Sequence, residues 1–100
     1  MKKITAIIRF VKMKEVEEAL NEEGVEEFTL TEVEGCGQQR GYIEFYQPDL
    51  HFRSKIKVEA LVKEESLEEV LSKIARVARL DFYGDGRIFV ASVVGEVIVI

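Results

Sequence analysis

The sequence is poor in the residues that build covalent frameworks, with one cysteine, one histidine, one proline and no tryptophan. A single cysteine, Cys36, excludes an internal disulfide framework. The apolar runs are far shorter than the roughly 20 residues that cross a bilayer. No charged start followed by a long apolar stretch marks a signal peptide. We therefore expect a soluble, cytoplasmic protein with no direct membrane insertion.

Catalytic constellations are also scarce. His51 is the only histidine and lies far in sequence from Cys36. A Cys-His pair for nucleophilic catalysis would have to be assembled by the fold, and these residues alone are too few for a closed zinc site unless subunits combine. We predict that the chain is not an enzyme, with no catalytic residue and no resident metal.

Basic residues are outnumbered, because 14 lysines and arginines stand against 19 aspartates and glutamates, for a net charge of -5. This balance argues against the basic face that a phosphate backbone needs, so nucleic acid is not an expected partner. A length of 100 residues with 47% hydrophobic and 33% charged residues suits one compact core. We predict a single domain over residues 1–100.

Apolar periodicity predicts two helices. The first spans residues 12–23, with Gly24 as its C-terminal cap, and has an apolar stripe of Met13, Val16, Ala19 and Leu20. The second spans residues 66–79 and repeats Leu67, Val70, Leu71, Ile74, Val77 and Ala78. Ser66 and Glu69 have the spacing of a capping box at its start.

Apolar and alternating segments predict strands at 3–10, 28–34, 55–62, 87–94 and 96–100. Segment 3–10 is expected to be central and covered on both sides, since Ile7 is apolar opposite the face of Ile4, Ala6, Ile8 and Phe10. Segment 55–62 puts Ile56, Val58, Ala60 and Val62 on one face and Lys55, Lys57, Glu59 and Leu61 on the other. Gly95 is the expected turn or bulge between the last two strands.

This order is the split pattern of an α+β ferredoxin-like βαββαβ sandwich, in which two helices cover one sheet face. The opposite face has no covering layer, although the last strands are apolar on both sides, through Phe89, Ala91, Val93, Val97 and Val99 on one side and Ile88, Val90, Ile98 and Ile100 on the other. An apolar uncovered face in an acidic chain predicts self-association.

A long connection between the second and third strands lacks a clean period. A structureless connection of this length is unusual in a small domain unless it is functional. Its aromatic residues are expected either to pack on a neighbouring element or to insert into a partner. They are Tyr42, Phe45, Tyr46 and Phe52.

The stretch "YGDGRIF" is the main candidate ligand loop. Gly84, Asp85 and Gly86 could turn successive backbone amides outward as an anion nest, beside the forked charge of Arg87. Such a glycine turn is more often a plain connection between helix and strand, and this one is neither a Walker nor a Rossmann glycine pattern.

Taken together, these segments resemble the PII signal-transduction proteins over nearly the whole chain. "MKKITAIIRFVKMKEVEEAL" is similar to the family's opening strand and helix, "TLTEVEGCGQQRG" to its second strand and entry to the T-loop, "KIKVEALV" to its third strand, and "GDGRIFV" to its B-loop. The resemblance implies a homotrimer, a T-loop at about 37–54 and a B-loop at about 82–87. It also implies ATP or ADP in clefts between subunits and 2-oxoglutarate held through magnesium.

The resemblance also implies roles for particular residues. The adenosine side would be lined by Ile7, Thr29, Gly35, Cys36, Gly37, Glu59 and Leu61, and the phosphates would meet Gly84, Asp85, Gly86 and Arg87. Gln39 would help to hold the metal and oxoglutarate, and Lys55 matches an effector lysine at the far end of the T-loop. Amide nests and cations suit polyphosphate.

The sequence departs from the family pattern at several of these positions. Gln38 stands where an arginine is usual, Val99 replaces one arginine of the closing strand, and a second would lie beyond Ile100. The T-loop is shortened and lacks the tyrosine that some members have uridylylated, and Phe82 with Tyr83 precedes the B-loop glycines. ATP affinity is therefore expected to fall.

The resulting prediction is an atypical PII-like sensor. It would bind ATP, ADP, AMP or another small anion, with magnesium only if ATP is bound, and would regulate an enzyme or membrane transporter through its loop. Two alternatives stay open: a ligand-free structural or adaptor trimer, and a metal-binding trimer resembling copper-tolerance proteins, with Cys36 and His51 as ligands.

Overall fold

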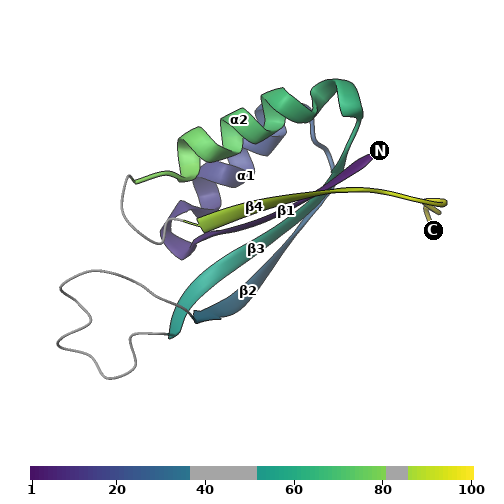
Figure 1. Ribbon diagram of the computed structural model, residues 1–100. Coiled ribbons are helices and arrows are strands. Elements are labelled where there is room, and N and C mark those ends of the chain that lie inside the picture. The colour runs from purple at the N-terminus through teal and green to yellow at the C-terminus, as the bar shows by residue number, and fades with distance from the viewer. Residues whose placement is uncertain (37–51, 81–85) are drawn as a thin grey trace, which may run out of the picture.

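The computed structural model describes residues 1–36, 52–80 and 86–100, with the backbone alone at residues 35, 36, 52 and 53 (Figure 1). The described chain has four strands, two helices and two short 3-10 turns. In order they are β1 (Lys2–Arg9), η1 (Phe10–Lys12), α1 (Met13–Glu22), β2 (Phe28–Cys36), β3 (Phe52–Val62), η3 (Glu64–Ser66), α2 (Leu67–Ala78) and β4 (Gly86–Ser92).

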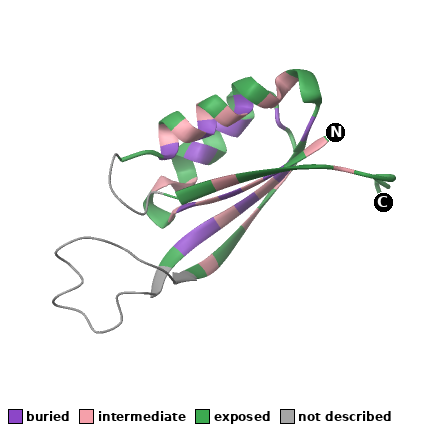
Figure 2. Ribbon diagram, in the orientation of Figure 1, coloured by how far each residue is buried: buried purple, intermediate pink, exposed green. Residues whose placement is uncertain are grey.

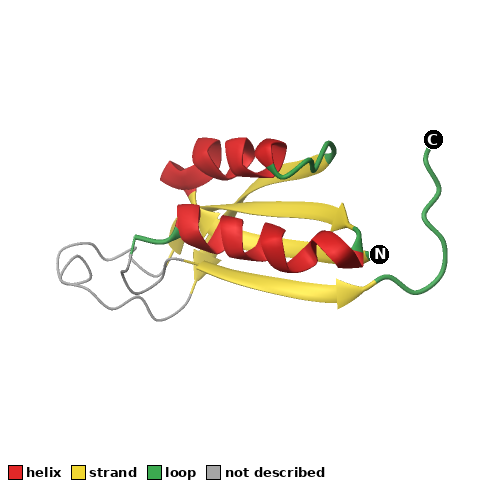
Figure 3. Ribbon diagram, turned by 90° about the horizontal axis from the view of Figure 1, so that it is seen from above, coloured by secondary structure: helices red, strands yellow, loops and turns green. Residues whose placement is uncertain are grey.

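The strands form one sheet in the order β2-β3-β1-β4, and every neighbouring pair is antiparallel. β1 is central, as expected, with β3 on one side and β4 on the other. Both helices lie side by side over one face of this sheet (Figures 1 and 3). This is the α+β ferredoxin-like βαββαβ sandwich that the element order predicts.

The core lies between the helices and the even-numbered residues of the inner strands, because successive strand side chains point to opposite faces. Figure 2 shows buried positions along the inner strands and on the parts of both helices that lie toward the sheet. The largest fully buried side chains are Ile4, Ile8, Val16, Leu20, Val58, Val70 and Ile74. The predicted helix stripes and the inward face of residues 55–62 are therefore confirmed.

Helix α1 ends as the sequence predicts, whereas α2 begins differently. Gly24 has a φ of 79°, and its N–H donates to the carbonyl of Asn21 at 3.1 Å. The predicted capping box is wrong, because the side chain of Ser66 makes no cap hydrogen bond. Ser66 instead closes the η3 turn, where its N–H donates to the carbonyl of Lys63 at 3.0 Å.

The C-terminal segment corrects two further expectations. Residues 93–100 follow β4 without forming a strand, so the predicted strand at 96–100 is absent from the described chain. Ile98 and Ile100 are exposed, because neither sheet edge of this chain pairs with the segment. Phe10 was expected beside Ile8 in the core, but it begins η1 instead and is 46% exposed.

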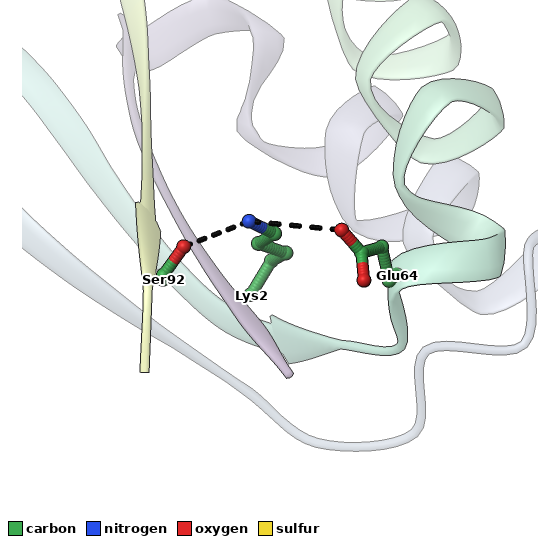
Figure 4. Close-up of polar contacts among 3 residues, drawn as sticks. All are labelled: Lys2, Glu64 and Ser92. Carbon is green, nitrogen blue, oxygen red and sulfur yellow. Dashed lines mark hydrogen bonds and ion pairs between the residues drawn. The ribbon is translucent and has the colours of Figure 1, made fainter. Parts of the chain in front are cut away.

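Polar contacts fix the end of β4 beside the start of β1 (Figure 4). The Lys2 ammonium group donates to Ser92 Oγ at 2.7 Å and lies 3.8 Å from Glu64 Oε1 of η3. The Val93 N–H donates to the Met1 carbonyl at 3.2 Å. These contacts hold β1, β4 and η3 together at the end of the sheet where both termini lie (Figure 1).

Candidate functional site

The sheet face opposite the helices, called the open face below, carries the odd-numbered residues of the four strands. No described helix covers this face (Figures 1 and 3). Strand alternation assigns these side chains to it, because their even-numbered neighbours fill the core. They include Lys3, Thr5 and Ile7 of β1, Thr29 and Thr31 of β2, Lys57, Glu59 and Leu61 of β3, and Arg87, Phe89 and Ala91 of β4.

The strand register arranges this face in rows that run across the sheet. One row joins Thr29, Glu59, Thr5 and Phe89, and the next joins Thr31, Lys57, Ile7 and Arg87. Leu61 lies opposite Lys3 in a third row. The expected adenosine-side residues Thr29 and Glu59 are therefore direct neighbours, and so are Ile7 and Arg87.

Glu59 lies between two lysines in the middle of this face. Its carboxylate is 2.8 Å from the Lys3 ammonium and 3.7 Å from that of Lys57. The hydrogen bond and charge of Lys3, followed by the charge of Lys57, lower the pKa of Glu59 below its ordinary value of 4.5. Glu59 is therefore ionised at neutral pH and keeps both lysines close to it.

A hollow of about 930 Å³ brings three of the expected adenosine-side residues together with the C-terminal segment. Thr29, Glu59 and Leu61 line one part of it, and Val97 and Val99 line another. The remaining walls come from Met1, Lys3, Glu17, Asn21, Glu26, Glu27, Phe28 and Ala60. The C-terminal segment thus contributes apolar wall to this hollow without joining the sheet.

Gly86 and Arg87 open β4 at the other end of the face. Gly86 has a φ of 148°, and a Cβ placed on it would collide with the backbone carbonyl of Ile7. Glycine is needed there because the two backbones approach too closely for a side chain. Gly86 and Arg87 also border a cavity of about 290 Å³ beneath α2, which Ile8, Ile74, Ala78 and Arg79 help to line.

Other predicted residues lie away from these rows or outside the described chain. Lys55 pairs in register with Arg9 and is 6% exposed. The backbones of Gly35 and Cys36 lie in β2, where Cys36 pairs in register with Phe52, so β3 begins within the segment expected as loop. Outside the described residues lie Gly37, Gln38, Gln39, Tyr42, Phe45, Tyr46, His51, Phe82, Tyr83, Gly84 and Asp85.

Sequence reasoning did not select Lys3 and Lys57 as site residues. The alternating pattern of residues 55–62 already put Lys57 on the same face as Glu59, which was the signal for it. Lys3 could be found only from the register, which sets it opposite Leu61 and beside Glu59. In the part of the chain that the structure describes, no cluster of three or more potential metal-ligating side chains occurs. Within the same ranges, no helix is long and apolar enough to span a membrane.

Comparison with known proteins identifies the family. The sequence profile described as "Nitrogen regulatory protein P-II" matches residues 1–100. The chain is 43% identical over 96 residues to "Nitrogen regulatory protein P-II" of Rhizobium meliloti, which covers 93% of this chain and 86% of that protein. It is 37% identical over 94 residues to "Nitrogen regulatory protein GlnK" of Escherichia coli, covering 91% and 84%. The chain therefore belongs to the P-II family of nitrogen regulatory proteins.

Proposed function

We propose that this P-II family regulator is a cytoplasmic homotrimer that senses a small anionic metabolite rather than catalysing a reaction. The ligand is an adenine nucleotide or a related anion, bound in clefts between subunits. The observation that best supports this is the joint occurrence of Thr29, Glu59, Ile7 and Arg87 in two adjacent rows of one uncovered sheet face. A second copy of the chain lying against this face would close a cleft over these residues.

The exposed apolar residues support the trimer. Phe89 on the open face is 55% exposed, and Val97, Ile98, Val99 and Ile100 of the C-terminal segment are exposed as well. Contiguous exposed apolar surface on a folded chain marks an association surface. Subunit contact on the open face would cover Phe89 and would give residues 96–100 a strand edge with which to pair.

The nucleotide would lie along the open face, with its two ends in different surroundings. We propose that Ile7, Thr29, Gly35, Cys36, Gly37, Glu59 and Leu61 contact the adenosine, and that Gly84, Asp85, Gly86 and Arg87 contact the phosphates. Arg87 suits this role because its planar guanidinium can donate two hydrogen bonds to one phosphate. Magnesium would enter only with ATP, and Gln39 and Lys55 would then meet a 2-oxoglutarate effector.

Affinity for ATP should be modest, since two expected cations are replaced. Gln38 and Val99 stand at positions where the family resemblance implies arginine. Each lost charged hydrogen bond removes about 1.5 to 3 kcal/mol of binding free energy. ADP and AMP, which carry fewer phosphates, should lose less than ATP does.

Regulation of a partner enzyme or membrane transporter would use the segment between β2 and β3. The aromatic residues Tyr42, Phe45 and Tyr46 of this segment, with Phe52 at the start of β3, supply the large apolar contacts that dominate protein interfaces. A ligand bound next to this segment can shift the population of its conformations toward the form that binds the partner.

The test combines light scattering with calorimetry on the purified full chain. We expect a mass about three times the monomer's 11.4 kDa and saturable binding of ADP, ATP or AMP. A trimer with no binding at millimolar nucleotide would contradict the sensor and leave the structural adaptor. Metal that co-purifies with the chain and is lost in Cys36→Ala would instead identify the copper-tolerance-like alternative, with Cys36 and His51 as ligands.

A further inference from the structure

The open face is strongly basic although the chain as a whole is acidic. Its strand residues include the cations Lys3, Arg9, Lys57 and Arg87, together with Lys55, which is only 6% exposed. Glu59 is the one carboxylate among them in the described strands. The whole chain has a net charge of -5. The excess acid lies elsewhere, much of it in η3 and the helices. An anion that approaches the molecule is therefore attracted to the open face.

Lys57 and Arg87 flank Ile7 in one row, on opposite sides of β1. Lys57 pairs in register with Ile7 across β3 and β1, and Ile7 pairs with Arg87 across β1 and β4. Adjacent strands are about 4.8 Å apart, so the two Cα atoms are separated by about 10 Å. The long side chains of lysine and arginine can converge across that distance on one phosphate group.

The ion pairs around Lys57 and Arg87 leave both side chains able to bind an anionic ligand. Glu59 makes its short contact with Lys3, at 2.8 Å, while its distance to Lys57 is 3.7 Å. The longer distance exceeds that of a normal charged hydrogen bond, so Lys57 can turn toward a ligand while Lys3 keeps Glu59 neutralised. No carboxylate of the described residues lies within ion-pair distance of Arg87.

We propose that Lys57 is a further ligand-binding residue that binds the phosphate end of the ligand together with Arg87. The ligand class is a polyphosphate anion. Lys57 of β3 adds a cation to the nucleotide-contacting residues named under the proposed function, which do not include it. Ile7, which the proposed function assigns to the adenosine, lies between the two cations in the same row. This inference rests on the proposed function and adds one residue to the same site.

The experiment measures calorimetric binding of ATP and of inorganic tripolyphosphate to the full chain and to three variants. Lys57→Gln removes the charge, Lys57→Arg keeps it, and Lys14→Gln is the matched control on the exposed surface of α1. We expect Lys57→Gln to weaken both ligands by about tenfold or more. Lys57→Arg should retain most of the affinity, and Lys14→Gln should be unchanged. Thermal melts check that all variants fold.

The outcomes separate this inference from the proposed function. If the parent chain binds ATP and Lys57→Gln binds both ligands equally well, the role of Lys57 is refuted and the sensor stands. If tripolyphosphate binds in a Lys57-dependent way but no nucleotide binds, the phosphate subsite stands and the adenine part of the proposed function fails. If neither ligand binds the parent chain, both proposals are refuted.

Discussion

The Glu59 carboxylate of β3 lies 2.8 Å from the Lys3 ammonium of β1, in the centre of the open face. Lys3 is the largest cause of the lowered pKa of Glu59. A carboxyl group whose pKa is lower in the folded state stabilises the fold at pH above its unfolded value, here 4.5. That contribution is lost as the pH falls through the lower, folded value.

The first prediction concerns this pair. Lys3→Gln should raise the pKa of Glu59 toward its ordinary value, because it removes both the hydrogen bond and the larger charge. Lys57→Gln should raise the pKa by less, since its contact is longer. Carboxyl carbon shifts followed by NMR across acidic pH would measure both. Equal shifts in the two variants would contradict the assigned order of causes.

Gly86→Ala should destabilise the fold by about 2 to 4 kcal/mol, because the new Cβ meets the Ile7 carbonyl and the backbone φ disfavours a side chain. Gly24→Ala is the matched control. Gly24 also has a positive φ, 79°, but a Cβ there meets open space, so only about 1 kcal/mol should be lost. Urea unfolding at neutral pH measures both changes. A cost at Gly86 no greater than at Gly24 would show that the close approach is absent.

Ile74→Ala should cost about 2 to 5 kcal/mol, since Ile74 of α2 is 1% exposed and its removal leaves a cavity in the core. Val11→Ala should change stability by less than about 0.5 kcal/mol, since Val11 is 70% exposed. Denaturant melts of the two variants give the comparison. Similar costs at both positions would mean that α2 does not pack on the sheet as described.

Phe89→Ser should weaken the proposed trimer, because Phe89 supplies exposed apolar area on the open face. Light scattering should find lighter species on dilution, toward the 11.4 kDa monomer. Val11→Ser, which removes an exposed apolar group outside that face, should remain trimeric. Equal dissociation of the two variants would place the subunit contact elsewhere.

The element order and the core could be predicted from sequence because both rest on local periodicity. Ile4, Ala6 and Ile8 alternate, and Val16, Ala19 and Leu20 repeat at helical spacing. Errors arose where tertiary pairing decides the outcome. β3 begins at Phe52 because its first residues pair with the end of β2, which their own pattern does not reveal. Residues 96–100 have a strand pattern but no partner strand within one described chain.

The candidate site was predictable only in part for the same reason. Alternation alone puts Lys57 and Glu59 on one face of their strand. It cannot say which residues of other strands lie beside them, because register is a property of the assembled sheet. Register is what brings Lys3 to Glu59 and Arg87 to Ile7. The cross-strand neighbours that make up the candidate site are therefore the part of it that local sequence predicts least well.

The contact of Met1 with Val93 has a practical consequence for labelled versions of the protein. Met1 lines the same hollow as Glu59 and Val97, and both chain ends lie at that end of the sheet (Figure 1). An affinity tag or fluorescent protein joined to either terminus would begin beside the hollow. Arg9 and Cys36 lie at the opposite end of the sheet, away from such a tag. Removable tags, cleaved before any titration, are therefore the appropriate choice.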